Sequence, residues 1–129
     1  MRTPALLLLL VLAFPGCKKN QDPPAIDLKT GAGYTSTDIY ASPGSTIVVG
    51  VNAAKTSDDL SLFYTEVAYD GANLPTLVSR VYASENEKEH FTRDVTITLR
   101  NTIGIERWIF DINDDEGRIS KKEIRIYVQ

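Results

Sequence analysis

Residues 111–117, which read DINDDEG, come closest in this chain to the residue types and spacing of a metal site. A calcium loop of the EF-hand kind needs oxygens at positions 1, 3 and 5, glycine at position 6 and glutamate at position 12. Counted from Asp111, position 6 is Glu116 and position 12 is Lys122, so the EF-hand interpretation fails. A looser calcium site on a loop stays an open hypothesis. We favour its alternative, a polar hairpin turn between two strands.

His90 is the only histidine, and it follows Glu87 by three residues. This spacing occurs in metal sites of helical bundles, but those sites draw ligands from several helices. A Ser-His-Asp hydrolase would need a serine in an elbow such as Gly-x-Ser-x-Gly, which the sequence lacks. Adjacent acids such as Asp58 and Asp59 are typical of solvated loops, and the sequence cannot place two carboxylates across a cleft. We therefore predict no metal, no cofactor and no catalytic residue, and so no enzyme.

Aromatic residues suggest a different chemistry, because an aromatic face stacks on a sugar ring and tyrosine adds a polar handle. Trp108 shares its parity along the chain with Phe110 and Ile112, so we expect it in the core. Four of the six tyrosines are expected to be partly exposed, namely Tyr40, Tyr64, Tyr82 and Tyr127. A platform of these rings would be typical of a glycan-binding protein, although no ligand-binding residue can be assigned from the sequence.

Cys17 is the only cysteine, so the chain cannot form an intramolecular disulfide. It follows residues 5–14, the apolar run ALLLLLVLAF, which comes after Arg2 and ends at Pro15 and Gly16. Ten apolar residues are too few to span a bilayer core, which needs about 20. They match the apolar region of a signal peptide.

The end of this segment, FPGC, resembles the lipobox of bacterial lipoprotein signal peptides, whose pattern is Leu-(Ala/Ser)-(Gly/Ala)-Cys. Gly16 and Cys17 match that pattern, Phe14 is bulkier than the usual leucine, and Pro15 is unusual. The resemblance implies that residues 1–16 are removed and that Cys17 carries a diacylglycerol thioether and usually an acylated amine. Two or three acyl chains hold a protein stably on a membrane, whereas one does so only marginally.

Two alternatives to lipidation are open: a secretory signal cut after a small residue such as Ala13, and a short uncleaved anchor. After Cys17, residues 18–24 read KKNQDPP, a polar segment whose final prolines favour an extended tether. We therefore assign residues 17–24 to the lipidated cysteine and its tether. The charges after Cys17 loosely resemble surface-export signals of some Gram-negative lipoproteins. We expect an outer-membrane location, with the periplasmic and the exterior side both open.

From Ala25 onward the hydrophobic period is mostly two, which is typical of strands. The segments STIVVGVNA, DVTITLR, GIERWIFDI and EIRIYV each place alternate apolar residues on one face. Turn signals separate the strands at residues 42–45, 55–59, 69–73 and 113–117. Residues 60–69 are apolar on both faces and predict a central strand, and residues 76–83 predict another after Pro75.

The weaker segments 25–30 and 34–41 are expected at sheet edges. Residues 84–91 predict at most a short helical turn, because Ser84 and Glu87 have capping-box spacing. These assignments give about seven or eight strands, a number and spacing typical of a β-sandwich.

The segment GIERWIFDINDDEGRISKKEIRIYV resembles immunoglobulin-like domains of bacterial surface proteins, including the PKD type, and the looser resemblance covers residues 42–128. Such domains show a glycine, alternating aromatic and aliphatic residues, an Asp-x-x-Gly-like turn and a last strand. The residues in those positions are Trp108, Phe110, Ile112, Asp114, Gly117, Ile124, Ile126 and Val128. The Cys-Trp-Cys core of antibodies is absent. The resemblance implies an all-β, Ig-like antiparallel sandwich over residues 25–129.

The formal net charge is -3, with 17 acids and 14 bases, which argues against nucleic acid as a partner. We predict a membrane-anchored lipoprotein whose domain is a non-catalytic binding or structural module of the cell envelope. Its partner would be an envelope protein or a surface polymer, docked through loops or a strand edge. The alternative is a glycan-capture accessory, calcium-assisted in one version. We expect a monomer, because no strand reads as a long, uncharged edge.

Overall fold

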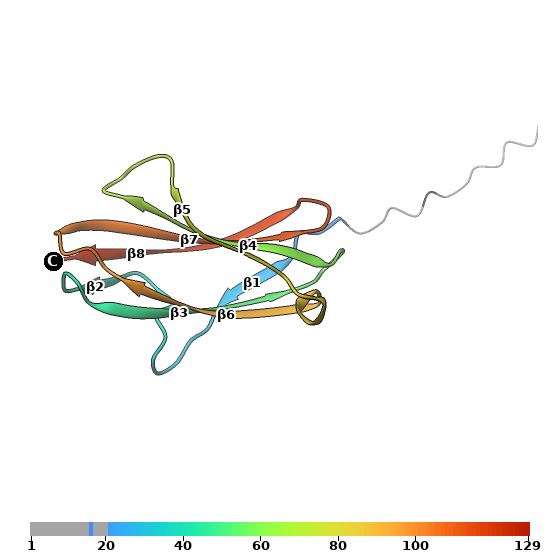
Figure 1. The fold of residues 1–129 in the computed structure, drawn as a ribbon, viewed down its shortest axis with the longest axis horizontal. Helices are drawn as coiled ribbons and strands as arrows, with labels where there is room; N and C mark the ends of the chain where they lie inside the picture. The colour runs from blue at the N-terminus through green and yellow to red at the C-terminus, as the bar shows by residue number, and fades with distance from the viewer. Residues whose placement is uncertain (1–15, 17–20) are drawn as a thin grey trace, which may run out of the picture.

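The computed structural model describes Gly16 and residues 21–129, and within this part the chain forms two β-sheets packed face to face (Figure 1). The rest of the predicted signal peptide, together with Cys17, lies outside the described residues. The elements are β1 (Ala25–Leu28), β2 (Ile39–Ala41), β3 (Thr46–Ala54), β4 (Leu60–Tyr69), β5 (Thr76–Tyr82), the 3-10 turn η1 (Glu85–Glu87), β6 (His90–Thr98), β7 (Gly104–Asp114) and β8 (Ile119–Val128). Among the described residues, no helix is long and apolar enough to cross a bilayer.

The eight strands of the described region form a three-stranded sheet, β1-β3-β6, and a five-stranded sheet, β2-β8-β7-β4-β5. Neighbouring strands there are antiparallel, except that β2 runs parallel to β8. The prediction of an all-β sandwich with seven or eight strands is confirmed. The order β1-β3-β6 facing β8-β7-β4-β5 is the distribution of strands A, B, E and G, F, C, C′ in immunoglobulin sandwiches.

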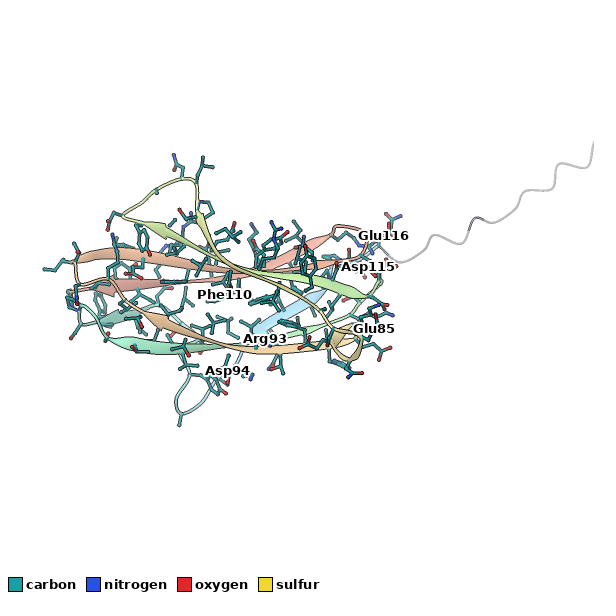
Figure 2. All side chains as sticks on the ribbon, in the orientation of Figure 1. Glu85, Arg93, Asp94, Phe110, Asp115 and Glu116 are labelled. Atoms are coloured by element: carbon teal, nitrogen blue, oxygen red, sulfur yellow. The ribbon has the colours of Figure 1, made fainter. Side chains whose placement is uncertain are left out.

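The inward faces of the two sheets form the core, as the period of two predicts. Figure 2 shows Phe110 pointing between the sheets, where it is fully buried. Phe63 of β4 and Phe91 of β6 meet across the core with ring centroids 5.2 Å apart. Trp108 is buried, as expected. Each such side chain contributes about 1.5–3 kcal/mol on burial. The other buried apolar residues include Val49, Val51, Leu60, Val67, Ile97, Leu99, Ile112, Ile124, Ile126 and Val128.

Two of the predicted turns close tight hairpins that need backbone with positive φ. At the β4–β5 turn, Asp70 and Gly71 have φ of 52° and 81°, and Ala72 donates its N–H to the Tyr69 carbonyl at 3.0 Å. Two central residues with positive φ define a type I′ turn, which suits the twist of a hairpin. At the β7–β8 turn, Gly117 has φ of 80°.

The weaker sequence segments also fold largely as expected. β1 and β2 are edge strands, but of different sheets, and β4 is paired on both sides. Ser84 and Glu87 form the predicted capping box, in which Glu87 Oε2 accepts from the Ser84 N–H at 3.0 Å. The helical segment is a single 3-10 turn.

One edge strand is largely exposed. β5 lies at the edge of the five-stranded sheet, is almost wholly exposed, and carries one charge, that of Arg80. The expectation that no strand forms a long, uncharged edge is not contradicted by β5, because this exposed edge strand is seven residues long and carries Arg80. Pro75 precedes the strand, and its pairing with β4 shifts register between Thr65 and Glu66. Both features hinder pairing with a further strand.

A buried carboxylate ties three segments together at the end of the sandwich that holds the C-terminus. Glu106 of β7 is 0% exposed. Its Oε1 accepts from the backbone N–H of Arg100 at 2.9 Å and from Arg100 Nε at 3.3 Å, and its Oε2 accepts from Trp108 Nε1 at 2.9 Å. The Arg100 guanidinium also donates to Asp70 at 2.9 and 3.1 Å, and Asp70 accepts the Ile105 N–H at 2.9 Å.

We expect Glu106→Ala to lower the free energy of unfolding by about 3 kcal/mol, because it leaves the buried Trp108 indole N–H and the part-buried backbone N–H of Arg100 without an acceptor. Urea unfolding followed by tryptophan fluorescence would measure the loss. Asp70→Asn is the matched control, since it removes the exposed carboxylate of the same network and should cost much less. Equal losses for both variants would contradict the central role of Glu106.

Candidate binding surface

The outer face of the five-stranded sheet gathers the four tyrosines that the sequence marks as partly exposed. Tyr40 of β2 and Tyr127 of β8 are in register, and their rings stack at 5.0 Å with an interplanar angle of 29°. Tyr64 of β4 and Tyr82 of β5 lie on the same face, since their chain neighbours pack against the core. Tyr40 is 69% exposed and Tyr82 is 68% exposed.

The two tyrosine pairs lie far apart along the strands. Tyr127 is opposite Ile105 of β7, whereas Tyr64 is opposite Asp111 of the same strand. Six residues of a strand correspond to about 20 Å. The tyrosines therefore share one face without forming one continuous platform.

A groove of about 420 Å³ lies at the Tyr127 end of this face. One wall is the β4–β5 loop with Asn73, and the floor carries Arg107 and Arg125 from β7 and β8. Register places these two arginines directly opposite each other. They share one carboxylate, that of Glu123, at 3.3 Å from Arg107 and 3.0 Å from Arg125.

An acidic residue occupies the middle of the face. Asp111 is 9% exposed, and its Oδ1 accepts no hydrogen bond among the described residues. Burial raises the pKa of this carboxyl, and the neighbouring carboxylate of Glu66 raises it further, while Lys121 acts in the opposite direction. The sequence singled out Asp111 only as part of a loop. Its proximity to Glu66, on another strand, carries no local signal.

The DINDDEG segment divides between a strand and a turn. Asp111 lies in β7, while Asp114 uses its carboxylate to hold the turn. Asp114 Oδ1 accepts the N–H groups of Glu116 at 3.0 Å and Arg118 at 2.9 Å, and its Oδ2 accepts from Arg118 Nε at 2.7 Å. The polar hairpin turn that we favoured is what the structure contains. In the described part of the chain, no three His, Cys, Asp or Glu side chains converge to hold a metal ion.

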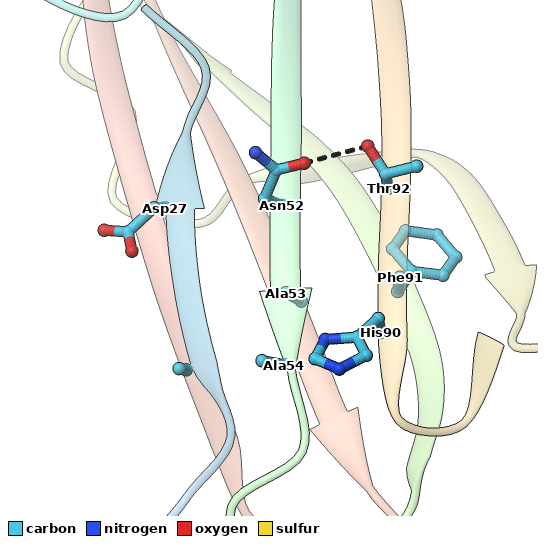
Figure 3. Close-up of a pocket in the computed structure, with 8 residues that line it drawn as sticks. Asp27, Asn52, Ala53, Ala54, His90, Phe91 and Thr92 are labelled. Carbon is cyan, nitrogen blue, oxygen red and sulfur yellow. Dashed lines mark hydrogen bonds between the residues drawn. The ribbon is translucent and has the colours of Figure 1, made fainter.

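His90 lines a shallow depression on the outer face of the three-stranded sheet (Figure 3). Its volume is about 260 Å³, and the small side chains of Ala25 and Ala54 are among those that line it. Thr92 Oγ1 donates to Asn52 Oδ1 at 2.9 Å beside it. Glu87, which the sequence paired with His90, is instead bonded to Ser84 and Arg93.

The adjacent acids Asp58 and Asp59, together with Glu85 of the 3-10 turn, lie near the entry of the N-terminal segment. Asp58 pairs with Arg118, Asp59 with Lys55 at 2.6 Å, and Glu85 with Lys88 at 2.9 Å. Figure 2 places Glu85, Asp115 and Glu116 at this end of the molecule. These carboxylates are used in ion pairs and turns, as solvated loops predict.

The fold and this surface define the chain as a small β-sandwich domain with a polar and aromatic outer sheet face. No protein-family model matches it, and no curated protein sequence matches it.

Solved structures match over most of its length. Sporulation control protein Spo0M from Bacillus subtilis has a TM-score of 0.54 and 12% identity, over 84% of this chain and 50% of its own. A family 123 glycoside hydrolase from Clostridium perfringens has a TM-score of 0.54 and 7% identity, over 82% of this chain and 27% of its own. At such identities the likeness shows the fold alone, and this chain spans half or less of either protein.

Asp111→Asn should stabilise the domain at neutral pH. Because the folded-state pKa of Asp111 lies above its ordinary value of 3.8, the charged form destabilises the fold above that raised pKa. The amide removes the charge and supplies a donor for Glu66, so we expect a gain of about 1 kcal/mol at pH 7. The gain should shrink towards zero below about pH 4, where Asp111 is protonated in both states.

Urea unfolding at several pH values measures this effect. Asp115→Asn is the matched control, since it removes a charge from an exposed turn of the same hairpin and should leave stability nearly unchanged. A variant less stable than the parent at pH 7 would show that the Asp111 charge is well compensated.

Proposed function

We propose that this chain is a lipoprotein of the bacterial cell envelope, anchored through lipid on Cys17, whose sandwich is a non-catalytic binding or structural module. The observation that carries the proposal is the position of the sole cysteine, directly after an apolar run too short to span a bilayer. An Ig-like domain after a polar tether suits this arrangement. The fold itself assigns no activity, since one architecture hosts many functions.

The entry of the N-terminal segment supports a defined orientation on the membrane. Pro24 is buried, and its carbonyl accepts Ser120 Oγ at 2.5 Å, beside the β7–β8 turn. Figure 1 shows the N-terminal segment leaving at this end, with the C-terminus at the opposite end. A lipid on Cys17 would hold the β7–β8 turn towards the bilayer. The ten residues of β8 span about 33 Å, so the opposite end would face outward.

The groove favours a binding role for the outward end. Arg107, Arg125 and Tyr127 line it at the end of the sheet remote from the tether. Acids in the tether-end loops are engaged in ion pairs rather than arranged around a cleft. We therefore retain a non-catalytic role, with an envelope protein or a surface polymer as partner.

A glycan-capture accessory is the second candidate function. The observation that favours it is the stacked Tyr40 and Tyr127 pair beside the groove. The two rings are stacked at 5.0 Å, so they present one joint aromatic surface. Such a surface is suited to a sugar ring.

Cys17→Ala should release the protein from the membrane fraction, because it removes the only side chain that can carry the thioether-linked lipid. Fractionation and mass spectrometry of the mature N-terminus would measure the change. Asn20→Ala is the matched control and should stay membrane-bound with an acylated Cys17. A parent protein without acyl mass on Cys17 would overturn lipidation.

Protease treatment of intact cells, with an internal periplasmic protein as control, would then assign the side. Loss of residues 25–129 from intact cells would place the domain on the surface. Protection until the outer membrane is breached would place it in the periplasm and weaken the case for glycan capture.

A further inference from the structure

We infer that the groove between the β4–β5 loop and strands β7 and β8 binds an acidic sugar, a sugar ring that bears a carboxylate. This inference rests on the proposed binding role and names its ligand class. Three features carry it: two opposed guanidinium groups, an aromatic surface beside them, and a groove of about 420 Å³. Small-molecule sites commonly measure about 300 to 1,000 Å³.

The positive charge of the two arginines in the groove is only partly neutralised by neighbouring carboxylates. Like charges directly opposite on neighbouring strands destabilise a sheet, yet Arg107 and Arg125 occupy such a pair. Their side chains share the single carboxylate of Glu123. Another acid, Asp38, directs Oδ1 to the backbone N–H of Arg125 at 2.8 Å. The guanidinium groups therefore retain donors for an incoming anion.

The arginines are accessible and suited to a carboxylate. The side chain of Arg107 is 28% exposed and that of Arg125 is 46% exposed. A guanidinium presents its N–H groups in a planar fork that matches the two oxygens of a carboxylate. A neutral ligand would leave these donors to water.

The aromatic side chain on one side of the groove favours a ligand that contains a sugar ring. Tyr127 lines the groove and is backed by Tyr40 at 5.0 Å, and the exposed side chain of Ile105 adjoins it. A sugar ring can place its C–H face against this surface while its carboxylate meets the arginines. Asn73 on the opposite wall offers an amide donor and acceptor for hydroxyl groups. A simple phosphate would leave the aromatic surface unused.

The end of this sheet face that carries Tyr64 lacks the combination of opposed arginines, aromatic surface and groove. There Arg80 lies over the ring of Tyr64, 5.4 Å from its centroid, so its charge already meets an aromatic face. Arg80 is not among the residues that line the groove. Arg80→Gln is therefore a matched control, because it removes one positive charge from the same sheet face outside the proposed site.

Isothermal titration of the full chain in detergent micelles would test the inference with matched acidic and neutral sugars. The acidic probes are oligogalacturonate, oligomannuronate and sialyllactose, and the neutral ones are oligogalactose, oligomannose and lactose. We expect at least one acidic probe to bind at least tenfold more tightly than its neutral counterpart. Arg107→Gln, Arg125→Gln and Tyr127→Ala should each weaken binding at least fivefold, and Arg80→Gln should change it less than twofold. Unchanged unfolding midpoints would show that the variants remain folded.

Three outcomes overturn the inference: no acidic probe binds, neutral probes bind equally well, or the groove variants bind as tightly as Arg80→Gln. Inorganic phosphate is included as a competitor. If phosphate displaces the sugar and Tyr127→Ala has no effect, the groove is an anion site without sugar recognition. Membrane retention through Cys17 is measured separately, by the fractionation of cells described for Cys17→Ala. If the protein is retained on the membrane but binds no sugar, only the groove inference is rejected. If the protein is not retained, the envelope anchor is rejected.

Discussion

The buried carboxylate of Glu106 is the constraint on which the end of the sandwich that holds the C-terminus depends. A carboxyl group inside a protein is tolerated only where hydrogen-bond donors reach it, and here they come from Arg100 and Trp108. Arg100 in turn holds Asp70, the first residue of the β4–β5 turn. That turn leads into the loop that walls the groove. The hydrogen bonds of buried Glu106 therefore help to position the β4–β5 loop that walls the groove.

The two outer sheet faces differ in how much surface they leave open. On the three-stranded sheet, the chain after β1 runs beside β3, where Lys29 donates its N–H to the Gly50 carbonyl at 2.8 Å. The Lys29 stem lies where a Cβ on Gly50 would be, and its ammonium pairs with Asp94 at 2.7 Å. The outer face of the five-stranded sheet instead presents its tyrosines and arginines to solvent. Recognition is therefore expected on that side.

The pairing of charged side chains differs between the two ends of the long axis. Near the entry of the N-terminal segment, charged side chains are paired with one another, as Arg118 is with Asp114. Towards the C-terminal end, Arg107 and Arg125 share one carboxylate, that of Glu123. The two solved proteins with a similar fold match 84% and 82% of this chain at only 12% and 7% identity. The site, not the fold, is therefore the basis for any functional inference.

Local sequence was sufficient for the strands, the core position of Trp108, the polar turn after Asp114 and the exposure of four tyrosines. Alternation and turn chemistry are local properties, so a single sequence reveals them. Tertiary structure alone decided that Glu106 is buried and that Arg107 faces Arg125. Each of these depends on sheet order and register, which segments distant in the chain determine by packing together.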